Sequence, residues 1–129
     1  MSDFSDTNLA DPKAIVLRFN ECINNRDIKG LSNLMTDDHT FIDSENRTDT
    51  GKSACIEAWT GFFKMFPDYK NIFTQIETKG NLVTITGYST CSDKRLEGLA
   101  IWTAKIKDGR VSEWRVYTDT QENRDQLLM

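Results

Sequence analysis

Four segments rich in β-branched and aromatic residues follow Pro67, and they constrain the fold more than any other feature of the chain. They cover residues 69–79, 81–91, 95–106 and 110–119. Short polar connections separate them, with the sequences KGN, SDK and KDG. Connections of this length join antiparallel neighbours. The second half of the chain is therefore expected to be a meander of antiparallel strands.

The first half carries helical patterns instead. Asp11 and Pro12 combine a capping residue with a proline at the first helical position, and apolar residues then recur at helical spacing. A second, short helix is expected over residues 28–35, and a third from near residue 52 to residue 66, where Pro67 disfavours its continuation. A strand over residues 39–43 and a turn-rich loop over 44–51 lie between these two helices.

Helices followed by a strand meander are typical of the α+β class, with the helices on one face of an antiparallel sheet. At 129 residues the chain is long enough for one domain. We expect a flexible arm over residues 1–10, a single domain over 11–122 and a tail over 123–129. A strongly curved sheet wrapped around helices also leaves a conical pocket, the usual place for a small ligand.

Composition excludes several classes of partner. The net charge is −4 and the sequence contains no basic cluster, which argues against nucleic-acid binding. The longest apolar runs are far shorter than a membrane span. The acidic, polar N-terminus does not resemble a secretory signal, so a cytoplasmic location is expected. The cysteines, Cys22, Cys55 and Cys91, fit buried thiols better than a disulfide framework or a zinc site.

Three stretches carry a resemblance to a known family: RFNECINNRDIKGLSNLMTDDHTFID, FFKMFPD and WTAKIKDGRVSEWRVYTD. In this order, from Asp11 to Asp119, the chain resembles the nuclear transport factor two-like superfamily, specifically its SnoaL-like (polyketide cyclase) branch. The resemblance implies a cone-shaped α+β barrel, a strongly curved antiparallel sheet wrapped around three N-terminal-half helices. It also implies a homodimer through the outer face of the sheet, and chemistry without a metal or redox cofactor.

Ketosteroid isomerases are a more distant resemblance, and they imply roles for three positions. The aspartate that acts as their general base falls on Asp43. Their oxyanion-binding tyrosine falls on Phe19, which cannot donate a hydrogen bond. Their protonated acid falls near Trp102, whose indole N–H can donate but cannot do the same work alone.

Two other catalytic sets are not matched. The histidine and aspartate of SnoaL-type cyclases fall on Trp102 and Val116. The Asp-Arg-Asp set of limonene-epoxide hydrolases, also a more distant resemblance, falls on Ser89, Gly87 and Val116. Asp43 is therefore the single candidate catalytic residue.

Two interpretations of Asp43 stay open. It alternates with Phe41 and therefore faces the interior, where partial desolvation would poise a carboxylate as a base. It could equally end the strand by accepting hydrogen bonds from the loop amides that follow. His39 is the only histidine, and no ligand set accompanies it, so no metal site is expected.

Further residues are expected to line the pocket. The tryptophans among them could form a cage for a planar ligand or simply be core. The predicted substrate-binding residues are Phe19, Phe41, Trp59, Phe63, Ser89, Trp102, Trp114, Val116 and Thr118.

On the outer face, Tyr88, Leu99, Ile101 and Tyr117 form an apolar strip that suits a partner subunit. The sequence thus predicts a SnoaL-like protein that binds a small apolar carbonyl or aromatic compound. It could act as an isomerase, cyclase or lyase with Asp43 as general base. The alternative is a non-catalytic binding or dimerisation module that has lost the catalytic set.

Overall fold

A computed structural model describes residues 11–129, and the predicted arm over 1–10 lies outside these residues. In chain order the elements are α2 (Pro12–Asn24), α3 (Ile28–Leu34), β1 (Met35–Ile42), β2 (Thr48–Thr50), α4 (Lys52–Met65), β3 (Lys70–Lys79), β4 (Leu82–Thr90), the 3₁₀ turn η1 (Lys94–Leu96), β5 (Gly98–Lys107), β6 (Arg110–Thr118) and α5 (Gln121–Gln126).

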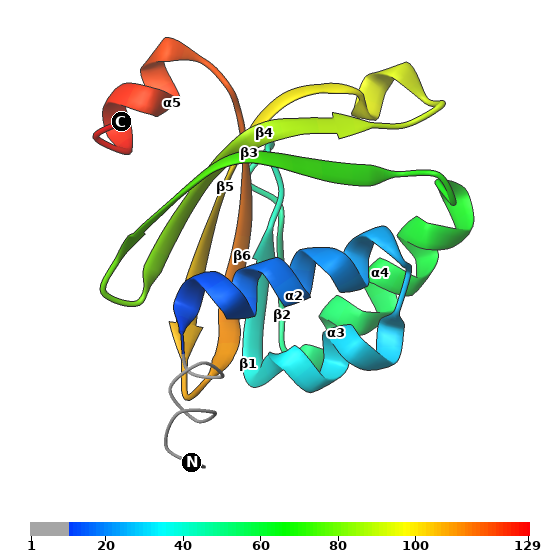
Figure 1. The fold of residues 1–129 in the computed structure, drawn as a ribbon. Coiled ribbons are helices and arrows are strands. Elements are labelled where there is room, and N and C mark those ends of the chain that lie inside the picture. Colours follow the sequence, from blue (N-terminus) through cyan, green and yellow to red (C-terminus); the bar gives the residue numbers. More distant parts are fainter. Residues whose placement is uncertain (1–10) are drawn as a thin grey trace.

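One curled sheet wraps around the N-terminal helices, as Figure 1 shows, and the α+β expectation is confirmed. The sheet has six strands in the order β2-β1-β6-β5-β4-β3 and stays open between its edges. It is not purely antiparallel, because β1 pairs with β6 in parallel. The expectation of an antiparallel sheet is corrected at this one junction. Parallel neighbours need a long crossover, and here the chain from β2 through β5 supplies it.

The helices form where their capping residues and apolar stripes indicate. The Asp11 side chain accepts a hydrogen bond from the amide of Lys13 at the start of α2, and Pro12 occupies the first helical position. Phe19 and its apolar neighbours on α2 are buried against the sheet. The helix α4 ends at Met65, because Pro67 follows.

Several element boundaries differ from those expected. Met35 is fully buried and already belongs to β1, so the strand begins four residues before His39. The predicted loop over 44–51 contains the short strand β2, which pairs antiparallel with β1. The C-terminal tail forms α5, which crosses the expected domain boundary at residue 122.

A bulge and a glycine make the sheet curl. The pairing of β3 with β4 shifts register between Phe73 and Gln75, and such bulges bend a strand and increase its twist. Gly87 lies opposite Phe73 at this point. A Cβ atom on Gly87 would lie 2.0 Å from the carbonyl oxygen of Ile72, so only glycine permits this approach.

Candidate functional site

Aromatic side chains fill the deep interior of the curled sheet. Phe19, Trp102 and Trp114 have no exposed surface. The Phe19 and Trp114 ring centroids lie 4.7 Å apart, and Phe73 lies 5.1 Å from Trp102. The structure therefore places three of the predicted ligand-binding residues in the packed core. None of them lines the hollows described below.

An apolar cavity of about 120 Å³ lies nearer the opening, between β1 and α4. Its walls are Phe41, Ala58, Trp59 and Phe62. Trp59 packs edge-on against both phenylalanines, with ring centroids 5.5 Å from Phe41 and 5.7 Å from Phe62. Phe63, another predicted residue, packs behind Trp59 at 5.4 Å and is itself buried. Two of the predicted ligand residues, Phe41 and Trp59, thus share one cavity.

The indole N–H of Trp59 is buried and has no hydrogen-bond partner within residues 11–129. The same is true of Trp102 and Trp114, but these two lie deeper in the core. A buried donor without a partner costs free energy, and such groups are uncommon. Of the three indoles, only that of Trp59 belongs to a residue that lines one of these hollows.

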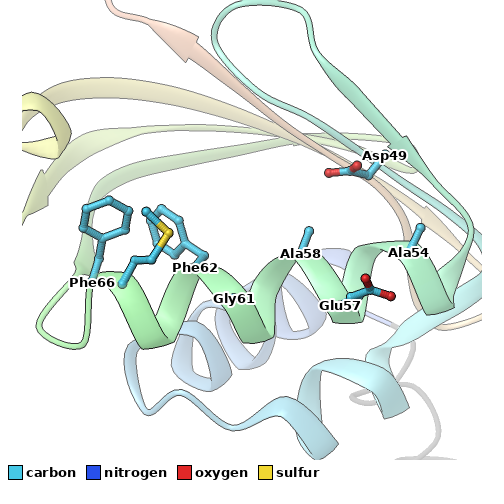
Figure 2. A pocket seen from close by; sticks show the side chains of 8 residues that line it. Asp49, Ala54, Glu57, Ala58, Gly61, Phe62 and Phe66 are labelled. Atoms are coloured by element: carbon cyan, nitrogen blue, oxygen red, sulfur yellow. The ribbon is translucent and has the colours of Figure 1, made fainter.

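A wider groove of about 630 Å³ opens along α4 and shares Ala58 and Phe62 with the apolar cavity. Figure 2 shows its aromatic end at the C-terminal part of α4 and its acidic end, with Asp49 and Glu57, beside β2. The complete lining is Asp49, Ala54, Glu57, Ala58, Gly61, Phe62, Met65 and Phe66. The small residues in the middle of α4 keep this groove open.

A third, polar hollow of about 240 Å³ adjoins Tyr69 at the start of β3. The rings of Phe62 and Tyr69 meet edge-on at 4.9 Å, and Tyr69 lines this hollow. Three of the predicted ligand-binding residues line this hollow: Ser89, Val116 and Thr118. Its remaining lining residues are Ser44, Arg95, Leu96, Glu97, Gly98, Leu99, Ala100 and Tyr117.

The sequence interpretation missed Tyr69. The face of the sheet on which Tyr69 lies could have been predicted by counting back from Phe73 in steps of two, because alternate residues of a strand share a face. That count places Tyr69 and Asn71 on the same side as Phe73. In the structure Asn71 is buried, and Tyr69 is half-buried and faces Ser89, with their oxygens 3.1 Å apart.

Asp43 lies in the loop between β1 and β2, half-buried beside the polar hollow. Its Oδ1 accepts hydrogen bonds from the backbone amides of Glu45 and Arg47, both at 2.9 Å. Its own amide donates to the carbonyl of Arg47. The neighbouring Ser44 lines the polar hollow, whereas Asp43 lines none of the three. Oδ2 takes part in neither of the two amide bonds.

His39 is fully buried, and its ring lies against that of Phe19. Its Nδ1 lies 2.6 Å from the carbonyl oxygen of Val111, which can only accept, so Nδ1 carries the proton. Burial lowers the pKa of His39 and keeps the imidazole neutral. Across the described residues 11–129, no three His, Cys, Asp or Glu side chains gather closely enough to hold a metal ion.

The three cysteines are free thiols, two of them buried. Burial raises the pKa of the Cys55 thiol, which therefore stays protonated. In the part of the chain that the structure describes, no helix is long and apolar enough to cross a membrane.

Solved structures of low sequence identity share this fold. A candidate SnoaL-like polyketide cyclase from Shewanella putrefaciens is 20% identical with a TM-score of 0.74, over 92% of this chain and 86% of that one. IdmH, a candidate polyketide cyclase from Streptomyces antibioticus, is 16% identical with a TM-score of 0.72, over 92% and 99%. An NTF2-like protein of unknown function from Cytophaga hutchinsonii is 15% identical with a TM-score of 0.71, over 92% and 95%.

No curated protein matches the chain by sequence. The family model described as the SnoaL-like domain matches residues 16–114, which include the walls of the apolar cavity and part of those of the polar hollow. The chain belongs to the SnoaL-like domain family.

Proposed function

We propose that this chain binds a small, planar, largely apolar molecule that carries a carbonyl group, at the mouth of the curled sheet. The observation that carries the proposal is the aromatic-walled cavity lined by Trp59, whose buried indole N–H has no partner among the described residues. A carbonyl oxygen would supply the missing acceptor, and the rings of Phe41 and Phe62 would contact the faces or edges of the ligand. The solved structures described as candidate polyketide cyclases are consistent with ligands of this kind.

The size of the cavity limits what enters it. An apolar cavity of roughly 150 Å³ holds a benzene ring, so about 120 Å³ accommodates one ring with little rearrangement. The remainder of a larger ligand would extend along the α4 groove, which shares Ala58 and Phe62 with the cavity.

Two matched substitutions on α4 test this placement. Ala58→Leu would fill the apolar cavity, whereas Ala54→Leu adds the same bulk to a residue that lines only the outer groove. Both alanines are exposed, so neither change creates strain in the core. For 2-acetonaphthone, followed by calorimetry, we expect Ala58→Leu to weaken binding about tenfold or more and Ala54→Leu to change it little. Equal effects would place the ligand in the outer groove alone.

A catalytic role for Asp43 is the second part of the proposal. Its support is the resemblance to ketosteroid isomerases, whose base falls on Asp43, and its place two residues after Phe41, which lines the apolar cavity. The two amides on Oδ1 would orient the carboxylate and leave Oδ2 to take a proton from a carbon beside the ligand carbonyl. The reaction class would then be isomerase, cyclase or lyase.

Exchange of the methyl protons of 2-acetonaphthone with deuterated water tests the catalytic role. If Asp43 is the base, we expect Asp43→Asn to slow the catalysed exchange about 10²- to 10⁴-fold. Glu21→Gln, a change of an exposed carboxylate on α2 that lines none of the three hollows, is the control. Exchange that Asp43→Asn leaves unchanged would refute the role.

The alternative is a binding module without catalysis. The filled interior and the two amides that hold Asp43 favour it. Tight binding of the ketone without accelerated exchange would establish this alternative and leave the proposed binding site intact.

We also propose that two copies associate through the outer sheet face. Strand register places Ile72, Tyr88 and Leu99 in one row across β3, β4 and β5, and all three are exposed. Ile101 of the expected strip is already fully buried, and Tyr117 is half-buried beneath Arg115. The exposed strip therefore keeps Tyr88 and Leu99 of the predicted set and gains Ile72.

Light scattering after size-exclusion chromatography tests the association. Leu99→Arg should convert a dimer to a monomer, because it places a charge at the most exposed residue of the row. Leu17→Arg, on the exposed side of α2, is the matched control and should stay dimeric. A monomeric wild-type protein would refute the dimer proposal.

A further inference from the structure

A chain of polar side chains leads from α2 to the polar hollow and fixes the orientation of Tyr69. It begins with Asn24, whose amide bonds both backbone groups of Asn71. Asn24 Oδ1 accepts from the Asn71 amide at 2.8 Å, and Asn24 Nδ2 donates to the Asn71 carbonyl at 2.9 Å. Asn20 Nδ2 donates to the same carbonyl at 3.2 Å. The first residues of β3 are therefore held against α2 by three hydrogen bonds.

The direction of the next two hydrogen bonds follows from counting protons. The Ser89 hydroxyl donates to Asn71 Oδ1 at 2.8 Å, and a serine has only one hydroxyl proton. Ser89 Oγ lies 3.1 Å from the Tyr69 hydroxyl and can only accept there. With the Asn71 amide in this orientation, Tyr69 donates its own proton to Ser89. Burial raises the pKa of Tyr69, so the phenol keeps that proton at neutral pH.

This direction determines what the Tyr69 oxygen can offer to a ligand. With its proton committed to Ser89, the oxygen can offer only lone pairs to a molecule in the polar hollow, which Tyr69 and Ser89 both line. We propose that Tyr69 is a specificity-determining residue that accepts a hydrogen bond from a ligand hydroxyl or N–H. This inference rests on the proposed binding function and narrows its ligand class.

Trp59 and Tyr69 require different groups at the two ends of the ligand: an acceptor opposite Trp59 and a donor opposite Tyr69. Phe62 touches both of them, at 5.7 Å from the Trp59 ring and 4.9 Å from the Tyr69 ring. A ligand that crosses Phe62 would meet a donor, the Trp59 N–H, at one end and an acceptor, the Tyr69 oxygen, at the other. The complementary molecule is an aromatic ketone with a hydroxyl group on the ring system.

The sharpest test uses a pair of probes that differ only in one proton donor. 6-Hydroxy-2-acetonaphthone and its 6-methoxy analogue have the same ring system and carbonyl, but only the first can donate to Tyr69. We expect the wild-type protein to bind the hydroxy compound about three- to tenfold more tightly. Tyr69→Phe should remove that preference and change the affinity for the methoxy compound less than about twofold. The methoxy compound thus controls for bulk and for folding of the variant.

A second variant tests the direction of the hydrogen bond between Tyr69 and Ser89. In Ser89→Ala the Tyr69 proton loses its acceptor and becomes free to donate to an ether oxygen. We expect this variant to bind the methoxy compound more tightly than the wild type does, which a purely structural role for Ser89 would not produce.

The possible failures can be told apart. If the wild-type protein binds both probes equally, or Tyr69→Phe keeps the preference, the role of Tyr69 is refuted and the proposed function stands. If the protein binds neither probe, the proposed function fails and this inference fails with it.

Discussion

Protonation of His39 should couple the stability of the fold to pH between 7.5 and 5.5. The imidazole is fully buried, Nδ1 donates to the Val111 carbonyl, and Nε2 has no partner within residues 11–129. Burial lowers the pKa of His39 from its ordinary value of 6.5. The charges of Asp38 and Glu113 oppose this effect and that of Lys52 adds to it, but burial dominates.

The sign follows from which state binds the proton. The unfolded chain takes up a proton on histidine as the pH falls through about 6.5, whereas the folded chain stays neutral there. Stability is therefore fully present above pH 6.5 and declines below it, until the folded pKa is reached. For one proton, the free energy of unfolding falls by at most about 1.4 kcal/mol between pH 7.5 and 5.5, the limit for a folded state that takes up no proton in that range.

Urea unfolding followed by tryptophan fluorescence measures this loss. His39→Asn is the control, because its side-chain amide can still donate to Val111 but does not titrate in this range. The difference between the two pH profiles isolates the histidine from the carboxylates. Parallel profiles for the two proteins would refute the reasoning and mean that His39 is protonated in the folded state as readily as in the unfolded one.

Two further predictions concern the frame that holds the site. Gly87→Ala should destabilise the protein by about 1–3 kcal/mol in urea unfolding, because its new Cβ would collide with the backbone carbonyl of Ile72; an unchanged midpoint would show that the bulge tolerates the methyl group. Asn24→Ala should cost about 1–3 kcal/mol, because the Asn71 amide loses its acceptor and the Asn71 carbonyl keeps only the longer hydrogen bond from Asn20. Asn25→Ala, one residue further and exposed, should change stability by less than about 0.5 kcal/mol, and equal losses would contradict the role of Asn24.

The order of helices and strands could be predicted because its signals are local. Asp11 and Pro12 start a helix, Pro67 ends one, and alternation of residue types marks the strands. The parallel pairing of β1 with β6 has no such signal, because it joins segments about seventy residues apart in sequence. The short strand β2 was missed for a related reason: its pairing with β1, not its composition, makes it a strand.

The candidate site was predicted in part. Trp102 was expected to face a ligand because Gly98, Ala100 and Ala104 share its side and leave room around it. Its inward direction agrees with the structure, but the ring of Phe73, on β3 beyond β4, packs against it with centroids 5.1 Å apart. Alternation along a strand gives the face of a residue and not its depth in the cone. Depth depends on which side chains from other elements pack against the residue. This packing places Trp102 in the core and leaves Trp59, on α4, at the wall of the apolar cavity.

The two interpretations of Asp43 differ in local hydrogen bonding, which the sequence could not resolve. A different loop length, or a change at Asn46, which has a φ of 65°, would alter which loop amides reach the carboxylate. The structure shows Oδ1 bonded to two amides, and the role of Asp43 as a base stays a prediction for the exchange experiment.

Binding at the mouth of the cone, rather than in its depth, is the central claim, and the indole signals of the three tryptophans test it most directly. In a ¹H–¹⁵N NMR titration with 2-acetonaphthone, assigned through Trp→Phe variants, we expect the Trp59 indole N–H signal to shift downfield as it gains an acceptor. The signals of Trp102 and Trp114 should move much less, because these rings lie in the packed core. A dominant shift at Trp102 or Trp114 would place the ligand in the deep interior, and no shift at any of the three would contradict binding at this mouth.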